Sequence, residues 1–284
     1  MGLCGRTKEI NYMQNFFDFT GKVVLVTGAS SGIGRATAEL FGKCGASVAI
    51  SYLKNKAGAE NAVAAISSNG HARFVGNAEG AAVGTATVSA IAVQADVTQL
   101  REIVRMVREV EGQLGPIDVL VNNAGSLVER LRTMELTEAR WNEVMNLNAT
   151  SAFFAAQAAI PKMLEKGGGA IVNVTSIAAR NGGAPGSIHY SSAKAAMLTM
   201  TKGLAKEYAA QGIRVNAVSP GVIDTPYHET FTAREVWNNM SNVIPMGRVG
   251  RSEEVASVIA FLASDAASYI CGETIEINGG MLMD

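Results

Sequence analysis

The chain of 284 residues has little charge of either sign and no long apolar run. Only 17% of its residues are charged, and 24 lysines and arginines balance 25 aspartates and glutamates. Such a balance creates no positive field that would attract a nucleic acid or an anionic membrane. No stretch approaches the roughly 18 apolar residues of a membrane-spanning helix, and no secretory signal opens the chain. We therefore expect a soluble, cytoplasmic protein.

Cysteine is also scarce. The three cysteines, Cys4, Cys44 and Cys271, are far apart and odd in number. Their spacing fits neither a disulfide framework nor the paired ligands of a zinc site. We expect unpaired thiols in a reducing compartment and no metal site.

What the sequence does contain is a regular alternation of short apolar runs and longer helical segments. The short runs are rich in β-branched residues and nearly continuous in hydrophobicity, which indicates strands covered on both faces. Their alternation with helices predicts an α/β fold: one Rossmann-type domain with a doubly wound, parallel, seven-stranded sheet and helices on both faces. The predicted strands are 23–26, 48–50, 91–93, 119–121, 171–174, 215–218 and 274–277, and the main predicted helices are 35–43, 100–110, 141–164, 193–209 and 253–263.

Three segments lie outside this regular pattern. Residues 1–18 are predicted to be a flexible extension before the domain at 19–284, and Met13 is a second candidate start. Residues 71–90, rich in Gly, Ala, Thr and Val, interrupt the alternation as an insertion, either a surface hairpin or a tolerated loop. Residues 226–242 are polar and aromatic, and we predict that they form a substrate lid with a helix.

The first predicted strand leads directly into TGASSGIGRA, residues 27–36. Glycines at this place allow a tight turn and the close approach of a pyrophosphate, whose charge the N–H groups of the next helix would bind. The spacing GxxxGxG differs from the commoner GxGxxG, and taken alone it could be a structural turn. Its position after the first strand favours a dinucleotide site. The predicted contacts are Gly28, Ser30, Ser31, Gly32, Ile33 and Gly34.

The end of the second predicted strand bears on which dinucleotide binds. An NAD site usually has an acid about 20 residues beyond the glycines, where it binds the ribose 2′-hydroxyl. Tyr52 takes that place here, and no carboxylate follows until Glu60. Arg35 and Lys54 are cations available nearby, although such side chains could simply be solvated. We therefore predict NADP(H) as the preferred cofactor, with NAD(H) as the alternative.

A tyrosine and a lysine share one helical face in HYSSAK, residues 189–194. Tyr190 and Lys194 are four residues apart, and Ser176 ends a predicted strand at the sheet edge where ligands bind. A cation about 4 Å from a phenol is worth roughly 4 kcal/mol at an effective dielectric of about 20. This spacing indicates that Lys194 lowers the pKa of Tyr190 for proton transfer. An exposed tyrosine beside a solvated lysine is the alternative for the pair alone.

The glycine turn, VNNAG, the strand-end serine and YSSAK, in this order, resemble the classical short-chain dehydrogenase/reductases from about Phe19 to Met283. The resemblance implies that Asn148 holds a water of a proton relay and that Lys194 also binds the nicotinamide ribose. It implies a homotetramer with the helices from about Trp141 and Tyr190 at one interface. The catalytic set it implies is Asn148, Ser176, Tyr190 and Lys194, and the further cofactor contacts are Asp96, Val97, Asn123, Ala124, Gly125, Tyr190, Lys194, Pro220, Gly221, Ile223 and Thr225.

These features predict an NADP(H)-dependent oxidoreductase that interconverts a small-molecule carbonyl and an alcohol. The C-terminal stretch resembles both the 3-oxoacyl-carrier-protein reductases and the NAD-dependent sugar or polyol dehydrogenases, and it does not separate them. A cofactor-binding sensor or scaffold is the alternative outside enzymes, because fold does not settle function.

Two details of the predicted site stay open at the level of sequence. The stretch between Ser176 and Tyr190 is one residue longer than is commonest in the resembled family, so Thr175 or Ser187 could share the role of the serine. Candidate substrate contacts are His189, His228, Arg180 and Trp237.

Overall fold

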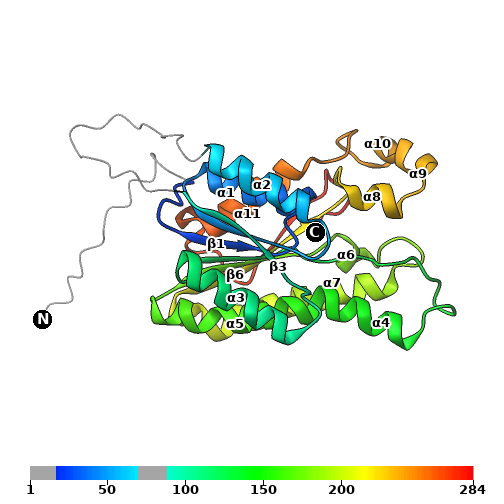
Figure 1. Cartoon of the computed structure of the whole chain (residues 1–284). Coiled ribbons are helices and arrows are strands. Elements are labelled where there is room, and N and C mark those ends of the chain that lie inside the picture. Colours follow the sequence, from blue (N-terminus) through cyan, green and yellow to red (C-terminus); the bar gives the residue numbers. More distant parts are fainter. Residues whose placement is uncertain (1–16, 70–87, 284) are drawn as a thin grey trace, which may run out of the picture.

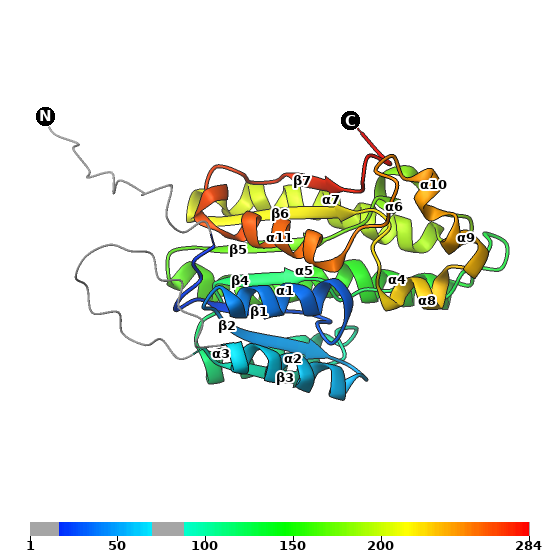
Figure 2. The same cartoon turned by 90° about the horizontal axis from the view of Figure 1, so that it is seen from above.

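Seven strands form one parallel sheet in the order β3-β2-β1-β4-β5-β6-β7 (Figures 1 and 2). The computed structural model describes residues 17–69 and 88–283. All seven predicted strands occur, most of them one or two residues longer at an end than predicted. They are β1 Val23–Val26, β2 Ser47–Tyr52, β3 Ala90–Gln94, β4 Val119–Asn122, β5 Gly169–Val174, β6 Ile213–Pro220 and β7 Thr274–Ile277.

Burial on both faces explains the continuous apolar runs of the strands. In β1, Val24 and Val26 belong to one hydrophobic cluster, whereas Val23 and Leu25 belong to the other. Successive side chains of a strand point to opposite faces, so a strand between two helical layers is apolar at every position. Figure 1 shows these layers above and below the sheet. One layer is α1 Gly32–Lys43, α2 Lys56–Asn69 and α11 Ser252–Ala263, and the other is α3 Leu100–Leu114, α5 Ser151–Glu165 and α7 Ile188–Tyr208.

The predicted continuous helix over 141–164 is wrong in one respect, because a π-helical turn interrupts it. The segment consists of α4 Glu138–Met145, the π turn η1 Asn146–Thr150 and α5. In η1 the amide of Asn148 donates to Val144 O at 2.9 Å and to Ser126 O at 2.8 Å. A side-chain amide that bonds a carbonyl four residues back competes with the backbone ladder, and such π turns are frequent at functional sites.

The predicted lid consists of three short helices instead of one. These are α8 Pro226–Phe231, α9 Arg234–Asn238 and α10 Met240–Val243. Figure 2 shows them at the end of the molecule toward which the strands point, where the loops after β4 and β5 also lie. The remaining short elements are α6 Ala178–Asn181, η2 Ala209–Gln211 and η3 Asp265–Ala267.

Two of the predicted segments lie largely outside the described residues. They are the N-terminal extension up to residue 16 and the insertion over 71–87. Across 17–69 and 88–283, no helix is long and apolar enough to cross a membrane.

Candidate active site

The glycine turn between β1 and α1 has the tight geometry that its sequence predicts. Gly28 and Gly32 have φ angles of 63° and 55°, in the left-handed region that glycine adopts without strain. A Cβ atom at Gly28 would lie 2.9 Å from the Cα of Ala124, so the turn packs directly on the segment after β4. A Cβ atom at Gly32 would lie 3.3 Å from the Cγ2 of Thr225. The turn therefore meets both NNAG and the start of the lid.

Asn123 holds this turn in place from the neighbouring strand. Its Nδ2 donates to Thr27 O at 2.9 Å and to Gly28 O at 3.1 Å. The hydroxyl of Ser51, near the end of β2, accepts from the N–H of Gly28 at 3.1 Å. The ends of β1, β2 and β4 therefore fix the turn. The first N–H groups of α1 have no partner within the helix and are available to a ligand at the turn.

A cavity of about 550 Å³ lies between this turn, the ends of the strands and the lid. Its size lies within the usual range of about 300–1,000 Å³ for small-molecule sites. The structure brings most of the predicted site residues to this one space. Those that line it are Gly28, Ser31, Gly32, Ile33, Gly34, Tyr52, Asp96, Val97, Asn123, Ala124, Gly125, Ser176, Tyr190, Lys194, Pro220, Gly221, Ile223 and Thr225.

Four predicted residues do not line the cavity: Ser30, Arg35, Lys54 and Asn148. The Nε of Arg35 pairs with Glu39 Oε1 at 2.7 Å, which directs its charge along α1. Lys54 is exposed beyond the end of β2. Asn148 lies fully buried behind the cavity wall.

Ser176, Tyr190 and Lys194 meet at the carboxyl edge of the sheet. The hydroxyl of Ser176 accepts from the N–H of Ala178 at 3.2 Å and hydrogen-bonds with Tyr190. The Nζ of Lys194 donates to Val174 O at 2.8 Å and lies 5.7 Å from the centre of the Tyr190 ring. The helical spacing of four residues thus brings the phenol and the amine to one place, as the sequence predicted.

The predicted tuning of Tyr190 by Lys194 is not what the structure shows. Burial raises the pKa of Tyr190, the nearby Tyr227 adds to this rise, and only the hydrogen bond with Ser176 opposes it. Burial also lowers the pKa of Lys194 to about 7, so its ammonium is only partly charged at neutral pH. Desolvation therefore dominates at both groups, and Tyr190 stays protonated as a hydrogen-bond donor.

An unpartnered acceptor lies beside the lysine. The Oδ1 of Asn148 is buried and has no hydrogen-bond partner among the described residues. A Cβ atom at Gly125 would lie 2.5 Å from this oxygen and 3.0 Å from the Nζ of Lys194. Because a buried acceptor is costly to leave unpaired, this position is suited to a bound water.

The alternatives to Ser176 have hydroxyl groups engaged elsewhere. Thr175 Oγ1 donates to Val218 O at 2.7 Å, within the sheet. Ser187 Oγ donates to Ala184 O at 2.5 Å. Each hydroxyl proton is therefore committed to a backbone carbonyl, which favours Ser176 as the serine that faces a substrate oxygen.

Of the four candidate substrate contacts, only His228 lines the cavity. The Nε2 of His189, which is buried, contacts Glu129 O at 3.1 Å. Arg180 pairs with Glu276 at 3.2 Å, and Trp237 stacks on His228 with ring centres 5.1 Å apart. Tyr227 and Met240, from the predicted lid, also line the cavity, and lining residues that sequence reasoning missed include Ser51, Leu53, Arg130, Val243 and Met281.

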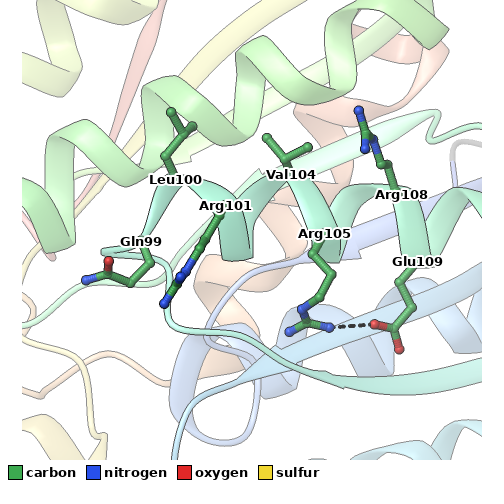
Figure 3. A pocket seen from close by; sticks show the side chains of 7 residues that line it. All are labelled: Gln99, Leu100, Arg101, Val104, Arg105, Arg108 and Glu109. Carbon is green, nitrogen blue, oxygen red and sulfur yellow. Dashed lines mark hydrogen bonds and ion pairs between the residues drawn. The ribbon is translucent and has the colours of Figure 1, made fainter.

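A second depression lies on the outer surface of α3 (Figure 3). All its lining residues come from one helix and the residue before it, and Arg105 is paired there with Glu109 at 2.7 Å. It contains neither a glycine turn nor a buried titratable pair, so we do not assign the reaction to it. Its lining residues are Gln99, Leu100, Arg101, Val104, Arg105, Arg108 and Glu109.

Burial of Lys194 predicts a pH dependence of stability. The pKa of Lys194 is about 7 in the folded chain and about 10.5, its ordinary value, in the unfolded chain. Between these two pH values the unfolded chain holds a proton on Lys194 that the folded chain has released. The free energy of unfolding therefore rises with pH from about 7. We expect this rise between about pH 7 and 9 in urea denaturation of the wild type, and we expect Lys194→Met to lack it.

Other shifted groups act outside that window. Burial raises the pKa of Cys44 and of Tyr190, whose ordinary values are 9.0 and 10.0, so they lower stability only above those values. His228, with a lowered pKa, acts below its ordinary 6.5. An equal slope in wild type and Lys194→Met would show that Lys194 is not the titrating group.

Known proteins are similar to this chain in sequence and in fold. A family model described as enoyl-(acyl carrier protein) reductase matches residues 28–282. The 3-oxoacyl-[acyl-carrier-protein] reductase of Staphylococcus aureus is 39% identical, over 92% of this chain and 98% of its own. The protein of the same name from Synechocystis is 39% identical, over 93% of this chain and 98% of its own.

A solved structure agrees with these matches. The crystal structure of a putative short-chain alcohol dehydrogenase from Sinorhizobium meliloti has a TM-score of 0.83 and 35% identity, and covers 94% of this chain and 98% of its own. Together with the glycine turn and the Ser176, Tyr190 and Lys194 cluster, these matches imply a nicotinamide cofactor. The chain belongs to the short-chain dehydrogenase/reductase family of oxidoreductases.

Proposed function

We propose that the protein transfers a hydride between NADP(H) and a small-molecule carbonyl or alcohol, with Tyr190 as the acid/base. The observation that carries this proposal is the convergence of Ser176, Tyr190 and Lys194 in the same cavity as the glycine turn. Binding sites of open parallel sheets lie at this carboxyl edge. The glycines and the N–H groups of α1 fit a pyrophosphate, and the cavity extends from them to Tyr190.

The side chains of this chain have separate tasks in the proposed reduction. Tyr190 donates its phenolic proton to the substrate oxygen, and Ser176 hydrogen-bonds the same oxygen. Lys194, with a pKa of about 7, is suited to pass a proton toward Tyr190 at neutral pH. The free Oδ1 of Asn148 would hold a water that supplies Lys194. A bound reduced nicotinamide supplies the hydride.

The preference for NADP(H) is supported by the missing acid at the end of β2. The lining residues there are Ser51, Tyr52 and Leu53, none of which would repel a 2′-phosphate. Asp96 is the one acid among the described residues that line the cavity, and its Oδ1 accepts from the N–H of Thr98 at 2.9 Å.

A carbonyl panel assayed with both cofactors tests this function. We expect NADPH to be oxidised with a carbonyl substrate, with kcat/KM about tenfold or more above that for NADH, because no carboxylate at the end of β2 repels the charged 2′-phosphate. Equal rates with both, or a preference for NADH, would contradict the cofactor assignment. Cofactor binding with no turnover on any carbonyl or alcohol would favour the sensor or scaffold alternative.

A narrower candidate function is the reduction of a 3-oxoacyl thioester. The relatives of 39% identity from two organisms are named for this activity, so such thioesters belong in the panel beside sugars and polyols. We also propose a homotetramer in the cytoplasm, in line with the exposed Phe153 on α5 and Ile188 on α7. Light scattering in solution would then give the mass of four chains.

A further inference from the structure

Arg130 is a cation in the cavity wall without an acidic partner among the described residues. Its Nε donates to Phe231 O at 2.8 Å, and its Nη1 to Pro185 O at 3.4 Å. The first carbonyl ends lid helix α8, and the second belongs to the loop between Ser176 and Tyr190. The guanidinium is thus held from two sides by neutral groups. Its Nη2 has no hydrogen-bond partner in the part of the chain that the structure describes.

A strained turn comes just before this arginine. Val128 has a φ of 65°, the one positive φ of a non-glycine residue within the described ranges. The N–H of Glu129 donates to Leu127 O at 2.7 Å, which closes a γ-turn around Val128. A β-branched residue avoids this conformation. Backbone strain of this kind is concentrated at active sites and ligand-binding segments, where the surrounding structure holds it in place.

The segment after the turn is fixed against the loop before Tyr190. Glu129 O accepts from the ring of His189 at 3.1 Å, and the N–H of Leu131 donates to Gly186 O at 3.1 Å. Both bonds flank Arg130. Two hydrogen bonds of the Arg130 side chain, two of its neighbours in sequence and the strained turn therefore hold this side chain in its position at the cavity.

A second donor, Tyr227, lies beside the reacting group. The rings of Tyr227 and Tyr190 have centres 6.1 Å apart. Burial raises the pKa of Tyr227, and the charge of Arg130 opposes that rise only in part. Tyr227 therefore keeps its proton at neutral pH. Its hydroxyl has no hydrogen-bond partner among the described residues, so it is available to a ligand.

Nearby groups do not cancel the charge of Arg130. Glu129, its neighbour in sequence, pairs with Arg140 at 3.0 Å. Burial, with help from Arg130, lowers the pKa of His228, which is therefore mostly neutral at pH 7. The lid side of the cavity is apolar, with Val236, Met240 and Val243. The cavity thus offers, in addition to Lys194, the cationic side chain of Arg130 and a hydrophobic wall.

We propose that Arg130 and Tyr227 bind a carboxylate of the substrate, so that the reducible carbonyl and the carboxylate belong to one molecule, an oxo acid with an apolar remainder. The planar guanidinium matches the two oxygens of a carboxylate, and the phenol adds a third donor. This inference rests on the proposed function, because it names the substrate class of the same site.

An oxo acid and its methyl ester, assayed side by side with NADPH, test the anchor. We expect Arg130→Gln to lower kcat/KM for the acid by about 10- to 100-fold and for the ester by less than about threefold, since a hydrogen bond to a charged group is stronger than one to a neutral group. Arg130→Lys should retain part of the activity on the acid. Arg132→Gln, the same change at a second exposed arginine that does not line the cavity, should leave kcat/KM unchanged for both substrates.

Inhibition by a carboxylate gives a readout that does not depend on finding the natural substrate. With a neutral ketone as substrate, butanoate should inhibit the wild type competitively, whereas butanamide and methyl phosphate should inhibit much less. Arg130→Gln should remove the inhibition by butanoate.

Equal losses on acid and ester would mean that Arg130 only steadies the lid, and would overturn the anchor. A wild type that reduces neutral carbonyls, but neither reduces oxo acids nor binds butanoate, would also overturn it and would leave the proposed function standing. If no carbonyl of the panel supported the oxidation of NADPH by the protein, the proposed function itself would be refuted.

Discussion

Replacement of Tyr190 by phenylalanine is expected to lower kcat by about 10³-fold, while the Kd of NADPH stays within about threefold of the wild type. The substitution removes only the hydroxyl that would donate to the substrate oxygen. The ring keeps its place beside Tyr227, 6.1 Å away between centres, so the cavity retains its shape. Steady-state reduction of a carbonyl substrate and a fluorescence titration with NADPH measure the two quantities separately.

The matched control is Tyr208→Phe. Tyr208 ends α7, the same helix, and packs on the hydrophobic cluster of the layer formed by α3, α5 and α7, without lining the cavity. We expect this variant to keep wild-type kcat. Full turnover in Tyr190→Phe would refute the acid/base assignment, and a loss of turnover in both variants would point to the helix instead of the hydroxyl.

The sheet could be predicted from sequence because its physical cause is local. A strand covered on both faces needs an apolar residue at every position, and β1, with the sequence VVLV, is buried throughout. The strand ends could not be predicted as well. Strand β6 runs over Ile213–Pro220, although the apolar run indicated only 215–218, because pairing with β5 and β7 extends it through polar residues.

The site could be predicted only in part, for a related reason. The spacing of Tyr190 and Lys194 on one helix fixes their approach, and the Nζ of Lys194 lies 5.7 Å from the ring centre of Tyr190. The expected lowering of the pKa of Tyr190 does not follow from that spacing, because desolvation depends on what the rest of the fold places around the pair. Arg130 was missed altogether, since its place depends on the backbone at Val128, where the sequence carries no glycine or asparagine to signal a positive φ.

Gly34→Ala is expected to raise the Kd of NADPH by on the order of 100-fold, through overpacking beneath the phosphate site. A Cβ atom there would lie 2.9 Å from Ala29 Cα and 2.9 Å from Gly28 O, and it would also collide with Asn123 Nδ2. The start of α1 would have to move away from β1. The N–H groups that are predicted to bind the pyrophosphate would move with it. Calorimetric titration with NADPH gives the Kd.

Gly112→Ala is the matched control for this substitution. Gly112 lies within α3, where an added Cβ atom meets nothing within 4 Å. Alanine replaces glycine in a helix interior with a gain of up to about 1 kcal/mol in stability. We therefore expect Gly112→Ala to bind NADPH like the wild type and to unfold at a slightly higher temperature. Equal weakening of NADPH binding in both variants would contradict a local effect at the turn.

A double variant separates the two parts of the expected clash. Asn123→Ala removes the side chain that Gly34→Ala would strike, but it also removes the bonds that hold Thr27 O and Gly28 O. The backbone atoms of Ala29 and Gly28 remain 2.9 Å from the new Cβ atom in either background. Gly34→Ala should therefore still weaken NADPH binding in the Asn123→Ala protein, though by a smaller factor than alone. If the second substitution restored full affinity, the side chain of Asn123, and not the close packing of α1 on β1, would be the reason that position 34 requires glycine.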